Sequence, residues 1–143
     1  TMRDITGQPT EDRGGEDSFS LIPAFKGENQ TGRETLISHS IGGSFAIRLS
    51  NWKLCLSAGS GGWSAPREPD ARKQNLPPMQ LFDLKRDRGE RKNLIDEHPE
   101  RVATLLRQLK KEVSQGRSTP GNPVSNDREV TFLPKGVSLP VRE

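Results

Sequence analysis

The feature that most constrains the fold is a set of three short runs with a period of two, joined by tight connections. The runs are "ETLISHS", "SFAIRLS" and "NWKLCLS", and they are rich in leucine, β-branched and aromatic residues. Gly42-Gly43 separates the first two runs, and Ser50-Asn51 separates the last two. Glycine and asparagine tolerate a positive φ, so both connections suit hairpins. The runs therefore predict an antiparallel meander.

Two further segments complete the predicted architecture. The stretch "MQLFDL" supplies a fourth strand, and "DEHPERVATLLRQLKKEVSQG" predicts an amphipathic helix over residues 99–115. Pro99 suits the first helical position, and Gly116 suits the position after the last turn. One helix that covers one apolar sheet face is a minimal α+β unit. The four antiparallel strands are expected at about residues 34–40, 44–49, 52–57 and 79–84.

Composition places this unit in the middle of the chain. Only 29% of the 143 residues are hydrophobic, and 14 glycines and 11 prolines lower the capacity for a buried core. Residues 1–17 are polar and glycine-rich, which indicates a linker, and "DSFSLIPAFKG" predicts a short helix over residues 19–26. Residues 117–143 look extended. We expect a compact domain over residues 18–116, with irregular N- and C-terminal extensions.

Charge, hydropathy and cysteine content exclude several classes of protein. The net charge is +3 with acids and bases intermixed, so no nucleic-acid partner is expected. No apolar run approaches the roughly 20 residues that a membrane span requires. The N-terminal segment lacks the apolar region of a signal peptide and looks like a cut inside a longer protein. The single cysteine, Cys55, excludes an internal disulfide and a cysteine-based zinc site.

Few titratable side chains are arranged for catalysis. The two histidines, His39 and His98, show no Ser/His/Asp order and no His-x-x-x-His spacing. His98 is typical of a helix N-terminus, and His39 lies near a strand end, where a solvated histidine is commoner than a ligand. The sequence "GSGGW" lacks the lysine of a phosphate loop. Its Trp63 either belongs to a flexible loop or offers a flat stacking surface to a ligand, and both interpretations stay open.

Several segments, in the correct order, resemble the C-terminal subdomain of bacterial type I sulfatases, the arylsulfatase branch of the alkaline phosphatase superfamily. In that family a strand ends in Leu-Tyr-Asp-Leu and is followed by Asp-Pro-x-Glu and Asn-Leu. Here "LFDL" (residues 81–84), "DRGE" (87–90) and "NL" (93–94) stand at these positions, with Phe82 replacing tyrosine and Arg88 replacing proline. The segments "EDSFSLIPAFKG", "FAIRLSNWKLCL" and "GRSTPG" resemble three further family motifs.

The resemblance covers roughly residues 15–127 and implies a fragment of a sulfuric ester hydrolase. Sulfatases use a formylglycine made in a Cys/Ser-x-Pro-x-Arg motif, beside a calcium ion, and both belong to the N-terminal catalytic domain. Here "SAPR" (64–67) is one residue too short, Cys55 is followed by Leu-Ser-Ala, and the calcium carboxylates are absent. We therefore expect no catalytic residue or metal ligand in this chain. Calcium and formylglycine are expected in the missing catalytic domain, which would be its partner.

The resemblance also implies a role in substrate selection. The loop from Ala58 to Arg67 corresponds to one that reaches the rim of the active-site pocket in sulfatases, where a sulfated small molecule or carbohydrate binds. The uncovered sheet face is expected to border the catalytic domain, so an exposed apolar patch and self-association of the isolated chain are expected. Family members are mostly exported, to the periplasm or the exterior. The candidate substrate-binding residues are Ser60, Gly61, Gly62, Trp63 and His39.

Two alternatives remain at this point. The first is a fragment of a phosphodiesterase or phosphonate hydrolase of the same superfamily, and a Cys/Ser-x-Pro-x-Arg motif upstream would favour the sulfatase over it. The second is a stand-alone module that binds an acidic glycan. Tight, salt-sensitive binding of sulfated glycans by the isolated chain would favour that module.

Overall fold

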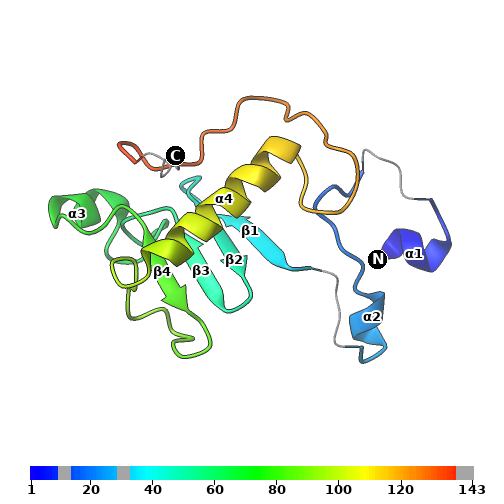
Figure 1. Ribbon diagram of the computed structural model, residues 1–143, viewed down its shortest axis with the longest axis horizontal. Helices are drawn as coiled ribbons and strands as arrows, with labels where there is room; N and C mark the ends of the chain where they lie inside the picture. The colour runs from blue at the N-terminus through cyan, green and yellow to red at the C-terminus, as the bar shows by residue number, and fades with distance from the viewer. Residues whose placement is uncertain (10–13, 29–32, 138–143) are drawn as a thin grey trace. The chain divides into compact units, whose positions relative to one another are not determined.

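The computed structural model describes residues 1–9, 14–28 and 33–137 (Figure 1). The chain divides into two compact units, each formed by two separate stretches. The first unit comprises Thr1–Glu34 and Lys110–Val130, and the second comprises Thr35–Leu109 and Thr131–Glu143.

The second unit contains a four-stranded antiparallel sheet, with the strands in the order β1-β2-β3-β4. The register aligns Ile47 with Leu54 and Leu54 with Leu81, so these side chains form one row on one face. The predicted four-stranded α+β architecture is confirmed. The strands are β1 (Thr35–His39), β2 (Phe45–Leu49), β3 (Trp52–Cys55) and β4 (Gln80–Asp83).

The connection between β2 and β3 differs from the expectation in its details. The residue with a left-handed backbone is Ser50, with φ 55°, whereas asparagine was expected to supply that conformation. The Arg48 side chain contacts this turn. Its Nε donates a hydrogen bond to the Ser50 carbonyl at 2.9 Å. A local bond of this kind helps to hold a serine where glycine or asparagine is usual.

The long helix α4 (Pro99–Gln115) covers the apolar row of the sheet (Figure 1). Its Leu105, Leu106 and Leu109 are buried, as the helical spacing of the sequence predicts. The start of α4 rests on Trp52, whose ring lies 5.0 Å from the His98 ring and 5.5 Å below the Arg101 guanidinium. Burial of each such leucine stabilises the fold by about 1.5–3 kcal/mol.

The opposite face of the sheet carries charge. Arg48 aligns with Lys53, and Lys53 aligns with Phe82. The Lys53 ammonium donates to both carboxylate oxygens of Glu90, at 2.7 and 2.8 Å. A shallow hollow of about 230 Å³ lies over this face, and Leu36 beside it is 45% exposed. The surface expected to border another domain thus combines an ion pair with an exposed leucine.

The turn after β4 is held by hydrogen bonds to side chains. The Asp87 carboxylate accepts the backbone N–H groups of Arg91 at 2.6 Å and Lys92 at 2.9 Å. Asn93 Oδ1 accepts the backbone N–H of Leu81 at 2.9 Å, which ties the end of the turn back to β4. The "DRGE" and "NL" motifs therefore serve as a rigid joint in this structure.

Short helices complete the described part of the fold. Helix α1 (Met2–Thr6) lies in the segment expected to be a linker, and α2 (Ile22–Phe25) is shorter than the expected helix over residues 19–26. Helix α3 (Glu68–Lys73) lies between β3 and β4, where the sequence analysis predicted no regular element. Acidic residues in the first turn of α3 and basic residues in its last turn suit the helix dipole.

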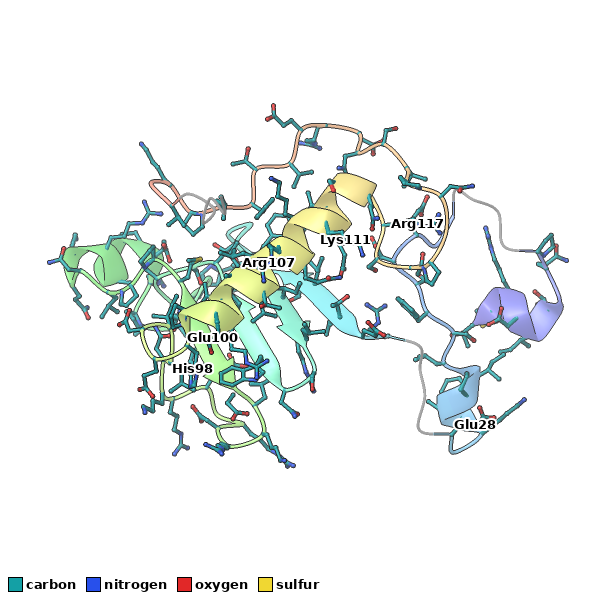
Figure 2. The ribbon with its side chains drawn as sticks, viewed as in Figure 1. Glu28, His98, Glu100, Arg107, Lys111 and Arg117 are labelled. Atoms are coloured by element: carbon teal, nitrogen blue, oxygen red, sulfur yellow. The ribbon has the colours of Figure 1, made fainter. Side chains whose placement is uncertain are left out.

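In the first unit, the "GRSTPG" segment is an ordered loop. The Asp17 carboxylate accepts the Ser118 backbone N–H at 2.8 Å, and the Glu16 carbonyl accepts the Thr119 hydroxyl at 2.6 Å. Arg117 is buried, and its guanidinium donates to the Asn122 carbonyl at 2.8 Å (Figure 2). Among the described helices of both units, none has the length and apolar character needed to cross a membrane.

Replacement of Asp87 by asparagine is predicted to lower the free energy of unfolding at pH 7. Backbone hydrogen bonds from Lys92 and Arg91 hold the pKa of the Asp87 carboxyl below its usual value. Because the folded-state pKa is depressed, the stabilisation is present above the unfolded pKa of about 4 and is lost as the pH falls through the folded pKa. Urea unfolding from pH 7 to pH 3 measures this difference.

The control is Asp96→Asn, which removes the same charge from an exposed side chain for which the described residues provide no hydrogen bond or ion pair. It is expected to change stability by less than about 0.5 kcal/mol. A deficit of the Asp87 variant that stays constant down to pH 3 would contradict the role assigned to the carboxylate.

Candidate functional site: the Ser57–Arg67 loop

The loop between β3 and α3 (residues 57–67) has a base fixed by two side chains. The Glu68 carboxylate accepts the backbone N–H of Gly59 at 2.9 Å and that of Ala58 at 3.3 Å. From β4, the Gln80 amide donates to the Ser57 carbonyl at 3.0 Å and to the Gly59 carbonyl at 2.8 Å. The N-terminal side of the loop base, residues 57–59, is therefore tied to both α3 and β4.

The loop then closes on itself. The Ser60 backbone N–H donates to the Pro66 carbonyl at 2.9 Å. Gly59 is buried at this closure, where a Cβ would lie 2.6 Å from the Pro66 carbonyl oxygen. Only a residue without a side chain allows the two strands of the loop to approach so closely.

Two of the predicted site residues have structural roles in the loop. The Ser60 hydroxyl donates to the Ser64 carbonyl at 2.7 Å and accepts the Gly62 backbone N–H at 3.2 Å. Gly61 has φ 69°, and its carbonyl accepts the Gly42 backbone N–H at 3.4 Å. Gly61 thus places the loop against the β1–β2 hairpin.

Trp63 projects from this fixed loop into solvent. Its side chain is 77% exposed, and its carbonyl accepts a hydrogen bond from Arg67 Nε at 3.3 Å. Next to it, Gly62 approaches Ile41 at the tip of the β1–β2 hairpin, where a Cβ on Gly62 would lie 3.6 Å from Ile41 Cγ2. Ile41 is itself 73% exposed. We call the exposed pair Ile41 and Trp63 the apolar rim.

The sequence interpretation missed Ile41, although a signal was present. A bulky apolar residue in "SIGGS", between a strand and a glycine turn, has no route to the core.

His39, by contrast, was singled out as a substrate contact. His39 is exposed at the end of β1 that leads into the β1–β2 hairpin. Its ring is edge-on to the Phe45 ring, with 4.0 Å between the two ring centroids. Its observed ring contact is with Phe45, and its substrate role stays a prediction.

Groups suited to catalysis are scarce around the loop. Burial raises the pKa of the Cys55 thiol, so it is protonated at neutral pH and a weak nucleophile. The described residues contain no cluster of three or more His, Cys, Asp or Glu side chains arranged to hold a metal ion. His98 packs against Trp52 and lies 3.5 Å from Glu100 at the start of α4 (Figure 2). The loop presents an exposed indole beside close-packed glycine backbone, an arrangement suited to a binding surface.

The comparisons with known proteins concern the fold. No protein-family model and no curated protein matches the sequence. A Bacteroides thetaiotaomicron structure labelled BT33336S-sulf, described with the metabolism of multiple glycosaminoglycans, matches with a TM-score of 0.59 and 23% identity over 77% of this chain. Ps i-CgsB, solved alone and in complex with k-i-k-neocarrahexaose, matches with a TM-score of 0.49 and 18% identity over 76% of this chain.

Both matched proteins are much longer than this chain. The chain covers 22% of the BT33336S-sulf chain and 21% of the Ps i-CgsB chain, about a fifth of their length. The fold of this chain is therefore similar to one part of the much longer BT33336S-sulf structure.

Replacement of Gly59 by alanine is predicted to open the loop base. The added methyl group would overlap the Pro66 carbonyl, and overpacking of this kind costs about 1–3 kcal/mol. Hydrogen exchange measured by mass spectrometry should show faster exchange in residues 57–68. The matched control, Gly62→Ala, places its methyl group at ordinary contact distance from Ile41 and should leave exchange at the loop base unchanged. Equal effects of the two variants would contradict this description of the loop.

Proposed function

We propose that the chain is the C-terminal part of a sulfatase and acts as a support for its catalytic domain. The observation that carries this proposal is the fold match to BT33336S-sulf, which takes in 77% of this chain but only 22% of the longer structure. The sequence motifs at residues 81–94 support it independently, because their resemblance to sulfatases rests on residue types and spacing rather than on backbone shape.

The chemistry of sulfate release then belongs to a catalytic domain outside this chain. The described residues offer a protonated Cys55 and no cluster suited to a metal ion. Formylglycine as the nucleophile and calcium as the bound ion are proposed for that domain, which is also the proposed partner of the charged sheet face. Export to the periplasm or the exterior is part of the same proposal.

We assign the Ser57–Arg67 loop to substrate selection. Its base is fixed by Glu68 and Gln80, so little ordering is required when a ligand binds. Its apolar rim presents the indole of Trp63, an aromatic surface suited to stacking on a sugar ring. Ser60 and Gly61 hold the loop in shape, and Gly62 brings its backbone next to the rim. The substrate class proposed from this arrangement is a sulfated carbohydrate.

Replacement of Trp63 by alanine, in the longer protein that contains this chain, tests both parts of the proposal. The native longer protein should release sulfate from a sulfated oligosaccharide. Loss of the indole surface should lower kcat/KM on that substrate by roughly two- to twelvefold, since an aromatic contact contributes about 0.5–1.5 kcal/mol. A small alkyl sulfate, which does not extend to the rim, should be hydrolysed at the native rate.

The control variant is Leu76→Ala, which removes an exposed apolar side chain outside the loop and should change neither rate. Unchanged kcat/KM of the Trp63 variant on the oligosaccharide would remove the loop from substrate selection. Cleavage of phosphodiesters or phosphonates without sulfate release would instead identify a related hydrolase of the same superfamily.

A further inference from the structure

The turn after β4 concentrates positive charge. We call residues 85–92 the cationic turn, because they contain five basic and two acidic residues. Their net charge of +3 equals the net charge of the entire chain. All five basic side chains are exposed, whereas both acidic residues are partly buried.

The two acidic side chains face into the turn and do not neutralise its outer surface. Asp87 is occupied by the backbone N–H groups of Arg91 and Lys92, at 2.6 and 2.9 Å. Glu90 has φ 53° and directs both carboxylate oxygens to the Lys53 ammonium on β3. The left-handed conformation of Glu90 is sterically costly for a residue with a side chain, and the paired hydrogen bonds help to maintain it.

The five basic side chains differ in how far they are already neutralised. Lys92 pairs with Glu97 at 2.8 Å, and Arg86 lies 3.8 Å from Asp83. Within the part of the chain that the structure describes, the side chains of Lys85 and Arg88 make no hydrogen bond or ion pair. Arg91 lies close enough to the Asp87 carboxyl to lower its pKa. The cationic turn thus presents unneutralised charge on a rigid backbone.

The cationic turn and the Ser57–Arg67 loop lie at opposite ends of the sheet. Leu84, which directly precedes the cationic turn, donates its backbone N–H to the Asn51 carbonyl in the β2–β3 hairpin at 2.8 Å. The loop leaves the other end of β3, after Cys55. Four residues of strand span about 13 Å, so a ligand that touches both surfaces must be several sugar units long.

We propose that the cationic turn binds the anionic groups of a sulfated polysaccharide, at a position remote from the substrate-selecting loop. This inference rests on the proposed function, and it adds a second contact region for a polymeric substrate. The planar guanidinium of Arg88 matches the oxygens of a sulfate group, and Lys85 adds a mobile point charge. Several such contacts act together through the release of counterions from the polymer.

The composition of the cationic turn disfavours two other polyanionic partners. Residues 85–92 contain no aromatic side chain, so the turn has no surface on which nucleic-acid bases could stack. They also contain no apolar side chain that could enter the acyl region of a membrane. A flexible chain of sulfated sugars requires neither feature.

The test uses the full chain and a fluorescently labelled chondroitin sulfate polymer, with binding measured by anisotropy at two salt concentrations. The triple variant Lys85→Gln, Arg88→Gln, Arg91→Gln should bind at least about tenfold more weakly and show a shallower salt dependence. The matched control, Arg107→Gln, Lys110→Gln, Lys111→Gln, removes the same charge from exposed positions on α4 and should change affinity less than about twofold (Figure 2).

Circular dichroism of both triple variants verifies that the fold is retained. Equal weakening in the two variants, or no binding of chondroitin sulfate by the native chain, would overturn the proposal. Equally tight binding of a single-stranded oligothymidylate, or of vesicles with 30% phosphatidylserine, would assign the turn to another class of partner. The assay requires no sulfate release, so its outcome is independent of whether the longer protein is a sulfatase.

Discussion

Burial of one sheet face beneath α4 is the constraint on which the rest of the second unit depends. Ile47, Leu54 and Leu81 lie in a single row and are completely buried, although only 29% of the chain is hydrophobic. A sheet this small is stable only when a helix covers it, because its strands cannot exclude water by themselves. The register of these strands in turn sets which loops emerge at each end, so the positions of both candidate binding surfaces follow from the core.

At each end of the sheet, a loop is held by side chains that satisfy its backbone groups. Glu68 and Gln80 fix the base of the Ser57–Arg67 loop, and Asp87 and Asn93 fix the turn after β4. Such hydrogen bonds between side chain and backbone give a loop a defined shape without adding to the core. The outward surface is then free to carry exposed groups that the core could not tolerate, such as the indole of Trp63.

Elements that depend on local pattern were predictable from the sequence. The two-residue period and the helical spacing around Leu105 reflect burial on one face, and the register and burial confirm both. The left-handed Ser50 and the anchoring of the loop by Gln80 were not predictable, because they arise from tertiary contacts. Helix α3 was not predicted, although acidic residues in its first turn and basic residues in its last turn are typical of a helix. The outward exposure of Ile41 had a signal in its position beside a glycine turn, whereas its closeness to Gly62 arises from tertiary packing.

The most direct measurement compares sulfate release from an aryl sulfate by this chain alone and by the longer protein that contains it, both with calcium present. We expect release by the longer protein only, because the described residues offer no activated nucleophile and no cluster suited to a metal ion. Sulfate release by the chain alone would contradict the role of an accessory domain. Absence of release by the longer protein would contradict its assignment to a sulfatase.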